Sequence, residues 1–185
     1  MVSEPWEFDA AREVFESQRR YLKGQKKLLP EQVRYGAMLE VPALAETLDI
    51  LAPRLSFLSI GTNDLTQFLF AADRSNPKLA ERYDWLSVSI MRFLKRVQQA
   101  VVGHNVDVTV CGEMGGRRLE ALALLGIGIR RLSITPAGVG PIKELVRKVD
   151  LDEITEAMNQ WLASPPPSLR EALIQWAAER GIEAD

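Results

Sequence analysis

The sequence predicts an α/β protein built on a parallel sheet with helices on both faces. Four short segments are apolar along their whole length instead of alternating with polar residues, which is typical of strands buried on both faces. Helical patterns separate these segments, as they do in βα units. The length of 185 residues and a composition of 46% hydrophobic and 26% charged residues fit a globular protein with a buried core.

The N-terminal third of the chain is predicted to hold a helix and the first βα unit. Apolar residues recur at helical spacing over residues 8–29, and Pro30 stops this pattern. A buried strand follows at 35–41 and is closed by Pro42. Residues 43–51 carry leucines on one face and form the helix of this unit.

The second unit has a buried strand at 55–60 that stops at the turn chemistry of residues 61–64, Gly-Thr-Asn-Asp. A helix begins at 65–70, and a long loop leads to an amphipathic helix at 88–102. The remaining elements are a third strand at 106–110 with a helix at 117–125, a fourth strand at 131–135 with a helix at 141–149, and two tail helices outside the sheet at 151–162 and 169–181.

Composition excludes several classes of protein. The 23 Lys and Arg residues against 25 Asp and Glu residues give a net charge of -2, which argues against a nucleic-acid partner. No run of eighteen apolar residues exists, so membrane insertion is not expected. The N-terminus has no secretory signal, and the single Cys is expected to be a reduced thiol, so a cytoplasmic location is predicted.

Unusual polar residues follow three of the predicted strands. Glu40 ends the first strand, Asn63 and Asp64 follow the second, and Cys111 ends the third. In α/β proteins the active site lies where strands run out into βα loops, so these side chains are expected at one rim. Two carboxylates and an amide are suitable ligands for a hard cation such as Mg²⁺.

Each of these residues also has a purely structural explanation. Glu40 could pair with an arginine, and Asn63 and Asp64 could form a turn or cap a helix. Cys111 could be a small buried apolar residue, although Gly112 and Glu113 after it place it at the rim.

Two further polar residues can also be explained by either a functional or a structural role. Arg74, in the long loop after the second strand, could form an ion pair with Asp73 or act as a clamp for a phosphate or a carboxylate. His104, the only histidine, lies in a polar turn at the opposite end of its unit, where a surface role is expected.

Four motifs at these positions carry a family resemblance. They are Gly-Ala-Met-Leu-Glu-Val-Pro at 36–42, Ser-Ile-Gly-Thr-Asn-Asp-Leu-Thr-Gln at 59–67, Ala-Asp-Arg-Ser-Asn at 72–76 and Cys-Gly-Glu-Met-Gly-Gly at 111–116. In this order they resemble the phosphoenolpyruvate-binding domain of enzyme I of the bacterial phosphotransferase system and of its nitrogen-related paralogue. The same domain occurs in pyruvate phosphate dikinase and phosphoenolpyruvate synthase.

The resemblance implies a role for each matching residue. Glu40 and Asp64 would hold Mg²⁺, and Asn63 would contact the phosphate of phosphoenolpyruvate. Arg74 would neutralise the transferring phosphoryl group. Cys111 would protonate the methylene carbon of the enolate, which yields pyruvate. These roles agree with the physics of phosphoryl transfer, which depends on positioning and charge stabilisation.

The resemblance also implies an incomplete fold. The family domain is a TIM-type (βα)₈ barrel, of which this chain would supply the second half, the last four βα units, plus C-terminal helices. The expected division is an N-terminal helix at 1–30, four βα units at 31–150 and a helical tail at 151–185. The arginines of the first half and the domain that carries a phosphohistidine would be missing.

If the chain is half of a barrel, we expect it to depend on other domains and to associate with a second chain. The chain is expected to be a fragment of a phosphoenolpyruvate-protein phosphotransferase whose upstream histidine passes the phosphoryl group to a phosphocarrier protein, and to be inactive in complete transfer by itself. Open sheet edges near Leu39 and Ile134 predict a homodimer. The alternatives are the corresponding piece of a dikinase or synthase, and a non-catalytic dimerisation module that senses phosphoenolpyruvate or pyruvate.

Overall fold

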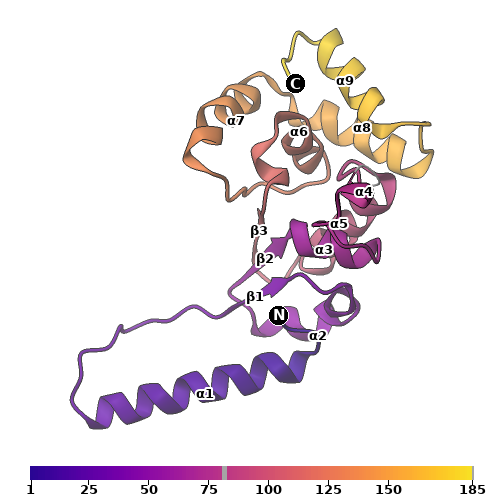
Figure 1. Cartoon of the computed structure of the whole chain (residues 1–185). Coiled ribbons are helices and arrows are strands. Elements are labelled where there is room, and N and C mark those ends of the chain that lie inside the picture. The colour runs from indigo at the N-terminus through magenta and orange to yellow at the C-terminus, as the bar shows by residue number, and fades with distance from the viewer. Residues whose placement is uncertain (81–82, 185) are drawn as a thin grey trace.

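A three-stranded parallel sheet lies at the centre of the computed structural model, which describes residues 1–80 and 83–184 (Figure 1). Its strands are ordered β1 (Gly36–Leu39), β2 (Phe57–Gly61) and β3 (Asp107–Cys111). The predicted α/β class and the parallel pairing of these strands are confirmed. Leu39 is in register with Ile60, and Gly61 is in register with Cys111. The carboxyl ends of the three strands therefore lie at one edge of the sheet.

The prediction of a fourth strand at 131–135 is wrong, because these residues do not form an extended strand. Within the described residues it is reduced to a single parallel bridge between Val110 and Leu132. The Val110 N–H donates to the carbonyl of Arg131 at 3.0 Å, and the Ser133 N–H donates to the carbonyl of Val110 at 2.8 Å. Pairing stops there because the next helix begins only three residues later.

That helix, α7 (Pro136–Lys148), starts five residues before the predicted start at Pro141. Thr135 is its N-cap residue and Pro136 its first residue, a position where proline needs no hydrogen-bond partner. Pro141 lies inside the helix and removes one backbone donor. The fold tolerates this because Ala137, whose carbonyl loses that donor, is exposed.

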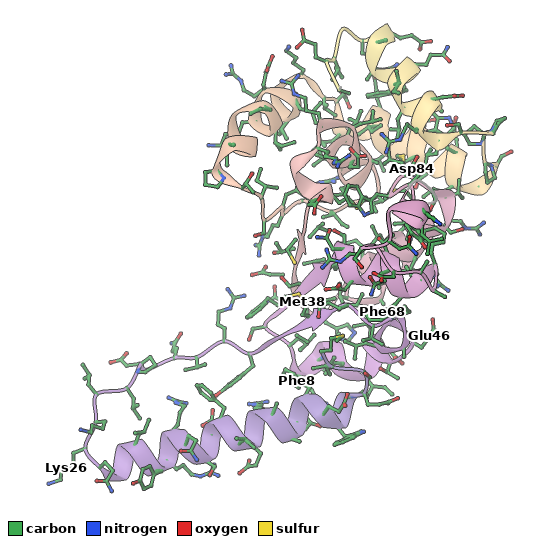
Figure 2. All side chains as sticks on the ribbon, viewed as in Figure 1. Phe8, Lys26, Met38, Glu46, Phe68 and Asp84 are labelled. Carbon is green, nitrogen blue, oxygen red and sulfur yellow. The ribbon has the colours of Figure 1, made fainter. Side chains whose placement is uncertain are left out.

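The N-terminal helix α1 (Pro5–Gly24) extends away from the sheet. Glu4 and Glu7 form a capping box at its start, and Phe8 is its only buried residue. The helix ends before the predicted boundary near Pro30. Figure 2 labels Phe8 where the helix meets the rest of the molecule and Lys26 at its far end, from which the chain runs back to β1.

The crossovers of the first two units are more broken than predicted. The expected helix at 43–51 is a 3₁₀ segment η1 (Pro42–Thr47) followed by one turn of α-helix. Of the expected turn at 61–64, Gly61 ends β2 and the other residues begin α3, and the expected long loop contains a short helix. The elements of this region are α2 (Leu48–Leu51), η2 (Ala52–Arg54), α3 (Thr62–Leu69), α4 (Pro77–Ala80) and α5 (Val88–Ala100).

The tail helices, which were predicted to lie outside the sheet, pack on the third unit. This unit continues from β3 through η3 (Met114–Gly116) into α6 (Arg118–Gly126), which is buried from Leu119 onward. Helices α8 (Leu151–Ala163) and α9 (Leu169–Glu179) cover α6. A Cβ atom on Gly126 would lie 2.5 Å from Met158 Cγ, so α6 and α8 approach closely at a residue without a side chain.

One hydrophobic cluster connects the two ends of the described chain, from Phe8 through the strands to Ile182 and Ala184. The division into an N-terminal helix, four units and a tail stays a prediction. Within the described residues, no helix has both the length and the apolar character needed to cross a membrane.

Candidate active site at the carboxyl edge of the sheet

The Glu40 side chain lies across the end of the neighbouring strand. Glu40 follows directly on β1 and is half-buried, and Gly61 ends β2 beside it. A Cβ atom on Gly61 would lie 2.7 Å from Glu40 Cγ and 2.9 Å from Glu40 Oε1. The missing side chain at Gly61 therefore provides the space that the Glu40 carboxylate occupies. The alternative of an ion pair between Glu40 and an arginine is not seen in the described part of the chain.

The Cys111 thiol shares this end of the sheet. Its Sγ atom lies 3.4 Å from the carbonyl oxygen of Ile60 and 3.8 Å from Met38 Sδ. Burial raises the pKa of Cys111, the hydrogen bond with the Ser59 side chain opposes this rise, and the Glu40 carboxylate adds to it. The half-buried thiol therefore carries its proton at neutral pH, which suits a proton donor.

The first turn of α3 is joined to the loop after β3. Thr62 Oγ1 donates to the carbonyl of Cys111 at 2.9 Å, and the backbone N–H of Glu113 donates to Asn63 Oδ1 at 3.3 Å. Gly112 has a φ of 101°, and a Cβ atom there would lie 2.7 Å from Thr62 Oγ1. Glycine is therefore required both by backbone conformation and by space. Because no side chain caps α3, the alternative of Asn63 as a helix cap is wrong.

Arg74 meets the rim through Asp64. Its guanidinium lies 3.4 Å from Asp64 Oδ1, while Asp73 accepts hydrogen bonds from Ser75 instead. The expected alternative of a pair between Arg74 and Asp73 is therefore not what the structure contains. The Arg74 and Asp64 side chains are 51% and 38% exposed, so water screens this pair and it contributes little to stability.

A cation at this rim would need ligands beyond the two acids. No group of three or more His, Cys, Asp or Glu side chains in the described ranges is arranged to hold a metal ion. Mg²⁺ is commonly held in proteins by one or two carboxylates, with waters and substrate oxygens completing its shell. Glu40 directly after β1 and Asp64 in the first turn of α3 are two carboxylates of this kind.

A pocket of about 560 Å³ adjoins the rim on the side of Asn63 and Arg74. Its lining includes residues that the sequence did not single out, among them Trp85, Arg117 and Arg170. The Arg117 guanidinium stacks 4.7 Å above the Trp85 ring. Arg117 directly follows the Cys-Gly-Glu-Met-Gly-Gly motif, which is a signal that could have been used, whereas no local pattern marks Trp85 or Arg170.

Arg170 ties the tail to the loop after α3. It makes two hydrogen bonds to the Asp84 carboxylate, of 2.9 and 2.7 Å, and a third of 2.7 Å to Glu120 Oε1. The Glu120 side chain is only 3% exposed, and Arg170 is its ion-pair partner. Burial acts to raise the pKa of Asp84, but hydrogen bonds from Arg170 and the Leu86 N–H outweigh it and lower that pKa.

The comparison with protein families agrees with this arrangement. Residues 1–151 match the family described as PEP-utilising enzyme, PEP-binding domain, where PEP is phosphoenolpyruvate. The chain belongs to this family.

The curated relatives are more specific. A phosphoenolpyruvate-protein phosphotransferase of Borreliella burgdorferi is 41% identical over 143 residues, which are 77% of this chain and 25% of that protein. The phosphoenolpyruvate-dependent phosphotransferase system protein of Escherichia coli is 37% identical over 183 residues, which are 98% of this chain and 24% of that protein. The chain thus spans about a quarter of the length of these relatives.

The raised pKa of Cys111 predicts slow alkylation at neutral pH. Only the thiolate reacts with iodoacetamide, so the rate should reach its half-maximum at a pH above the ordinary thiol value of about 8.5. Glu40→Gln removes a negative charge that disfavours the thiolate, so it should lower this midpoint without bringing it to the ordinary value. Mass spectrometry of the protein across a pH series measures both rates, because Cys111 is the only cysteine.

The matched control is Glu46→Gln, which neutralises an exposed carboxylate on η1 and should leave the midpoint unchanged. A folded wild-type midpoint at or below that of the urea-unfolded chain contradicts the account.

Proposed function

We propose that the chain is the phosphoenolpyruvate-binding portion of a phosphoenolpyruvate-protein phosphotransferase. The observation that carries this proposal is the placement of Glu40, Asn63 and Cys111 at adjacent strand ends, in a chain of the PEP-binding family. The relatives bear phosphotransferase names, so the dikinase, synthase and sensor alternatives are not favoured.

In this proposal the chain folds as the second half of a (βα)₈ barrel. The bridge at Leu132 marks the fourth strand position, and β1 has an edge without a partner strand among the described residues. The first half of the barrel would pair along that edge. It would also supply the further cationic groups that a substrate carrying both phosphate and carboxylate requires.

Glu40 and Asp64 would hold Mg²⁺, and this ion would neutralise charge on the phosphoryl oxygens when bound. Their fit to the metal rests on oxygen ligands and on the space above Gly61, which keeps the Glu40 carboxylate at the rim. Asn63 would contact the substrate phosphate through its amide. Arg74 would stabilise the charge on the phosphoryl group. Its guanidinium would leave the exposed ion pair with Asp64 and contact the substrate instead.

Cys111 would complete the reaction. The bond between phosphorus and the enol oxygen breaks, and the phosphoryl group passes to a histidine of the upstream part of the parent protein. The enolate that remains takes a proton from Cys111 Sγ at its methylene carbon and becomes pyruvate. A thiol with a raised pKa retains its proton until the enolate forms. A phosphocarrier protein in the cytoplasm would then receive the phosphoryl group from that histidine.

A chimeric protein tests this proposal, because a relative supplies the upstream part of the enzyme. The chain replaces the matching quarter of the Borreliella burgdorferi phosphotransferase, and pyruvate release from phosphoenolpyruvate is followed with Mg²⁺. We predict that Cys111→Ala lowers the rate at least about 100-fold, the usual contribution of a positioned acid. Asp64→Ala should abolish the Mg²⁺-dependent activity, because one of only two proposed carboxylate ligands is lost.

The control is Asp49→Asn in the same chimera, which changes an exposed acid on α2. This variant should release pyruvate at the rate of the unmutated chimera. Circular dichroism establishes that each variant is folded. Wild-type rates in both Cys111→Ala and Asp64→Ala would show that these residues are not the site.

The chain alone is proposed to form a homodimer through the open edge of β1. Met38 on this strand is 39% exposed, and Phe57 beside it on β2 is 37% exposed. An unpaired edge next to exposed apolar side chains favours pairing with another chain. Helix α1 offers further apolar surface at Trp6, Val14 and Tyr21, which are more than half exposed.

Light scattering tests this association. A mass of about twice the 20.7 kDa of the chain is expected at high concentration. Met38→Lys should shift the protein toward monomer, because a lysine at an edge opposes pairing. Val139→Lys on α7, where the parent side chain is 38% exposed, is the matched control and should remain dimeric. A strict monomer at high concentration contradicts the homodimer.

A further inference from the structure

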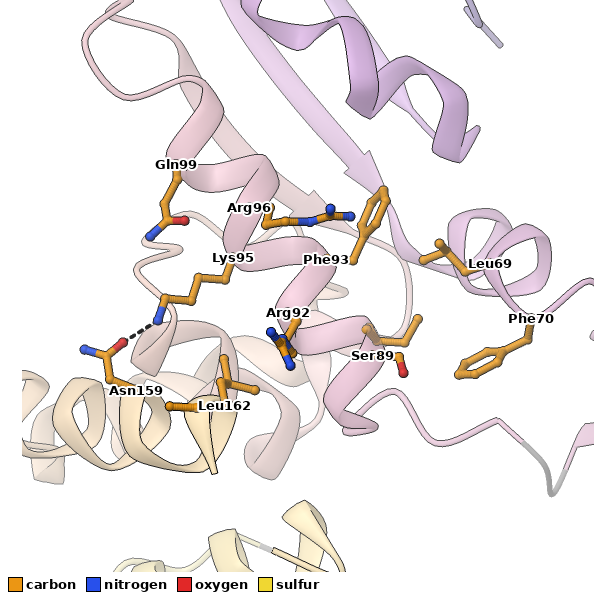
Figure 3. Close-up of a pocket in the computed structure, with 12 residues that line it drawn as sticks. Leu69, Phe70, Ser89, Arg92, Phe93, Lys95, Arg96, Gln99, Asn159 and Leu162 are labelled. Carbon is orange, nitrogen blue, oxygen red and sulfur yellow. Dashed lines mark hydrogen bonds between the residues drawn. The ribbon is translucent and has the colours of Figure 1, made fainter. Parts of the chain in front are cut away.

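A second pocket lies apart from the strand-end rim and is lined by different residues. It has a volume of about 580 Å³ and is enclosed by the end of α3, one face of α5 and the end of α8 (Figure 3). It shares no residue with the rim, whose α3 residues Asn63 and Asp64 lie at the opposite end of that helix. Its volume is in the range of small-molecule sites.

The polar part of this pocket is cationic. Arg92, Lys95 and Arg96 occupy positions i, i+3 and i+4 of α5, so they project from one face of the helix. No acidic residue belongs to the lining. None of the three cations forms an ion pair with a carboxylate of residues 1–80 and 83–184. Three positive charges thus face one concave space without an opposite charge from the described protein.

One of these cations is held in place by the tail. Lys95 Nζ donates to Asn159 Oδ1 at 2.5 Å, which joins α5 to α8 across the pocket (Figure 3). The guanidinium of Arg96 lies 5.7 Å from the centre of the Phe93 ring. The positions of these two cations are therefore defined by neighbouring residues instead of being set by solvent alone.

The remaining wall is apolar. Ile90, Phe93 and Leu162 are buried residues that line the pocket, and Leu69 and Phe70 complete it at the end of α3. Like charges four residues apart slightly destabilise a helix, and an anion bound between Arg92 and Arg96 would relieve this repulsion. A bound ligand with a compact, multiply charged head and an apolar remainder would satisfy both parts of the lining.

We propose that this pocket binds an organic phosphate. A phosphate group offers two or more negative charges on a compact head, and arginine binds it with paired hydrogen bonds. The apolar wall formed by Phe93 and Leu162 would contact the organic part of the ligand. This inference does not rest on the function proposed for the rim, since the two sites have no residue in common.

The test uses phenyl phosphate as the probe, with inorganic phosphate as the comparison, in calorimetric titrations of the full chain. Phenyl phosphate should bind the wild type, bind more tightly than inorganic phosphate, and weaken as salt screens the charges. Arg92→Gln and Arg96→Gln should each weaken phenyl phosphate binding about tenfold or more, the effect of losing one charged hydrogen-bond donor.

Two control variants make the result specific to this pocket. Arg147→Gln removes an exposed arginine of α7 and should leave the affinity unchanged. Arg74→Gln removes the rim arginine and should also leave it unchanged, which separates this pocket from the phosphoenolpyruvate site. Circular dichroism checks that all variants keep the fold.

Three results would overturn the proposal. The first is no binding of phenyl phosphate at millimolar concentration. The second is equal affinity for inorganic phosphate, which would leave the apolar wall without a role. The third is binding that persists in Arg92→Gln and Arg96→Gln but is lost in Arg74→Gln, which would place the probe at the rim.

Discussion

The parallel register of β1, β2 and β3 is the constraint on which the candidate site depends. It aligns Leu39 with Ile60 and Gly61 with Cys111, so three strand ends meet at one level. At that level the chain has no side chain on Gly61, and the Glu40 carboxylate occupies the space. A shift of one residue in either pairing would turn the rim residues to the other face of the sheet. Register and the missing Cβ atom together create the site.

The charged groups at the rim differ from those around it in their exposure to water and in their partners. Burial and the Glu40 carboxylate raise the pKa of the Cys111 thiol, while Asp64 and Arg74 form an exposed pair that water screens. Behind the rim, Arg170 of the tail balances Asp84 and the buried Glu120. The tail thus stabilises the wall of the adjoining pocket, although residues 152–184 lie beyond the part matched by the family. The ion pair at the rim is therefore exposed, whereas the one that supports it includes a buried carboxylate.

Sequence patterns predicted those parts of the fold that local chemistry determines. Three apolar runs became strands and the two tail helices formed where their caps and breaks indicated. The fourth strand is reduced to one bridge because α7 begins at Pro136, five residues before the start that the sequence predicted. Thr135-Pro136 and Pro141 are competing helix-start signals, and a local pattern does not decide between them. Arg170 reaches partners 50 and 86 positions away, so no sequence motif reveals it. The rim residues were predictable because they follow strand ends, but their contacts were not.

The cation site proposed at the carboxyl edge of the sheet would be formed by Glu40 and Asp64. Paramagnetic broadening of backbone amide signals by Mn²⁺, which prefers the same oxygen ligands as Mg²⁺, tests it most directly because it detects weak binding. The account predicts that signals of Glu40, Gly61 to Asp64 and Cys111 broaden first, and that Gly61→Ala reduces this broadening because its Cβ atom displaces the Glu40 carboxylate. Gly140→Ala, where a Cβ atom meets nothing within 4 Å, should not reduce it. Broadening that is centred elsewhere, or that is unchanged in Gly61→Ala, would contradict the account.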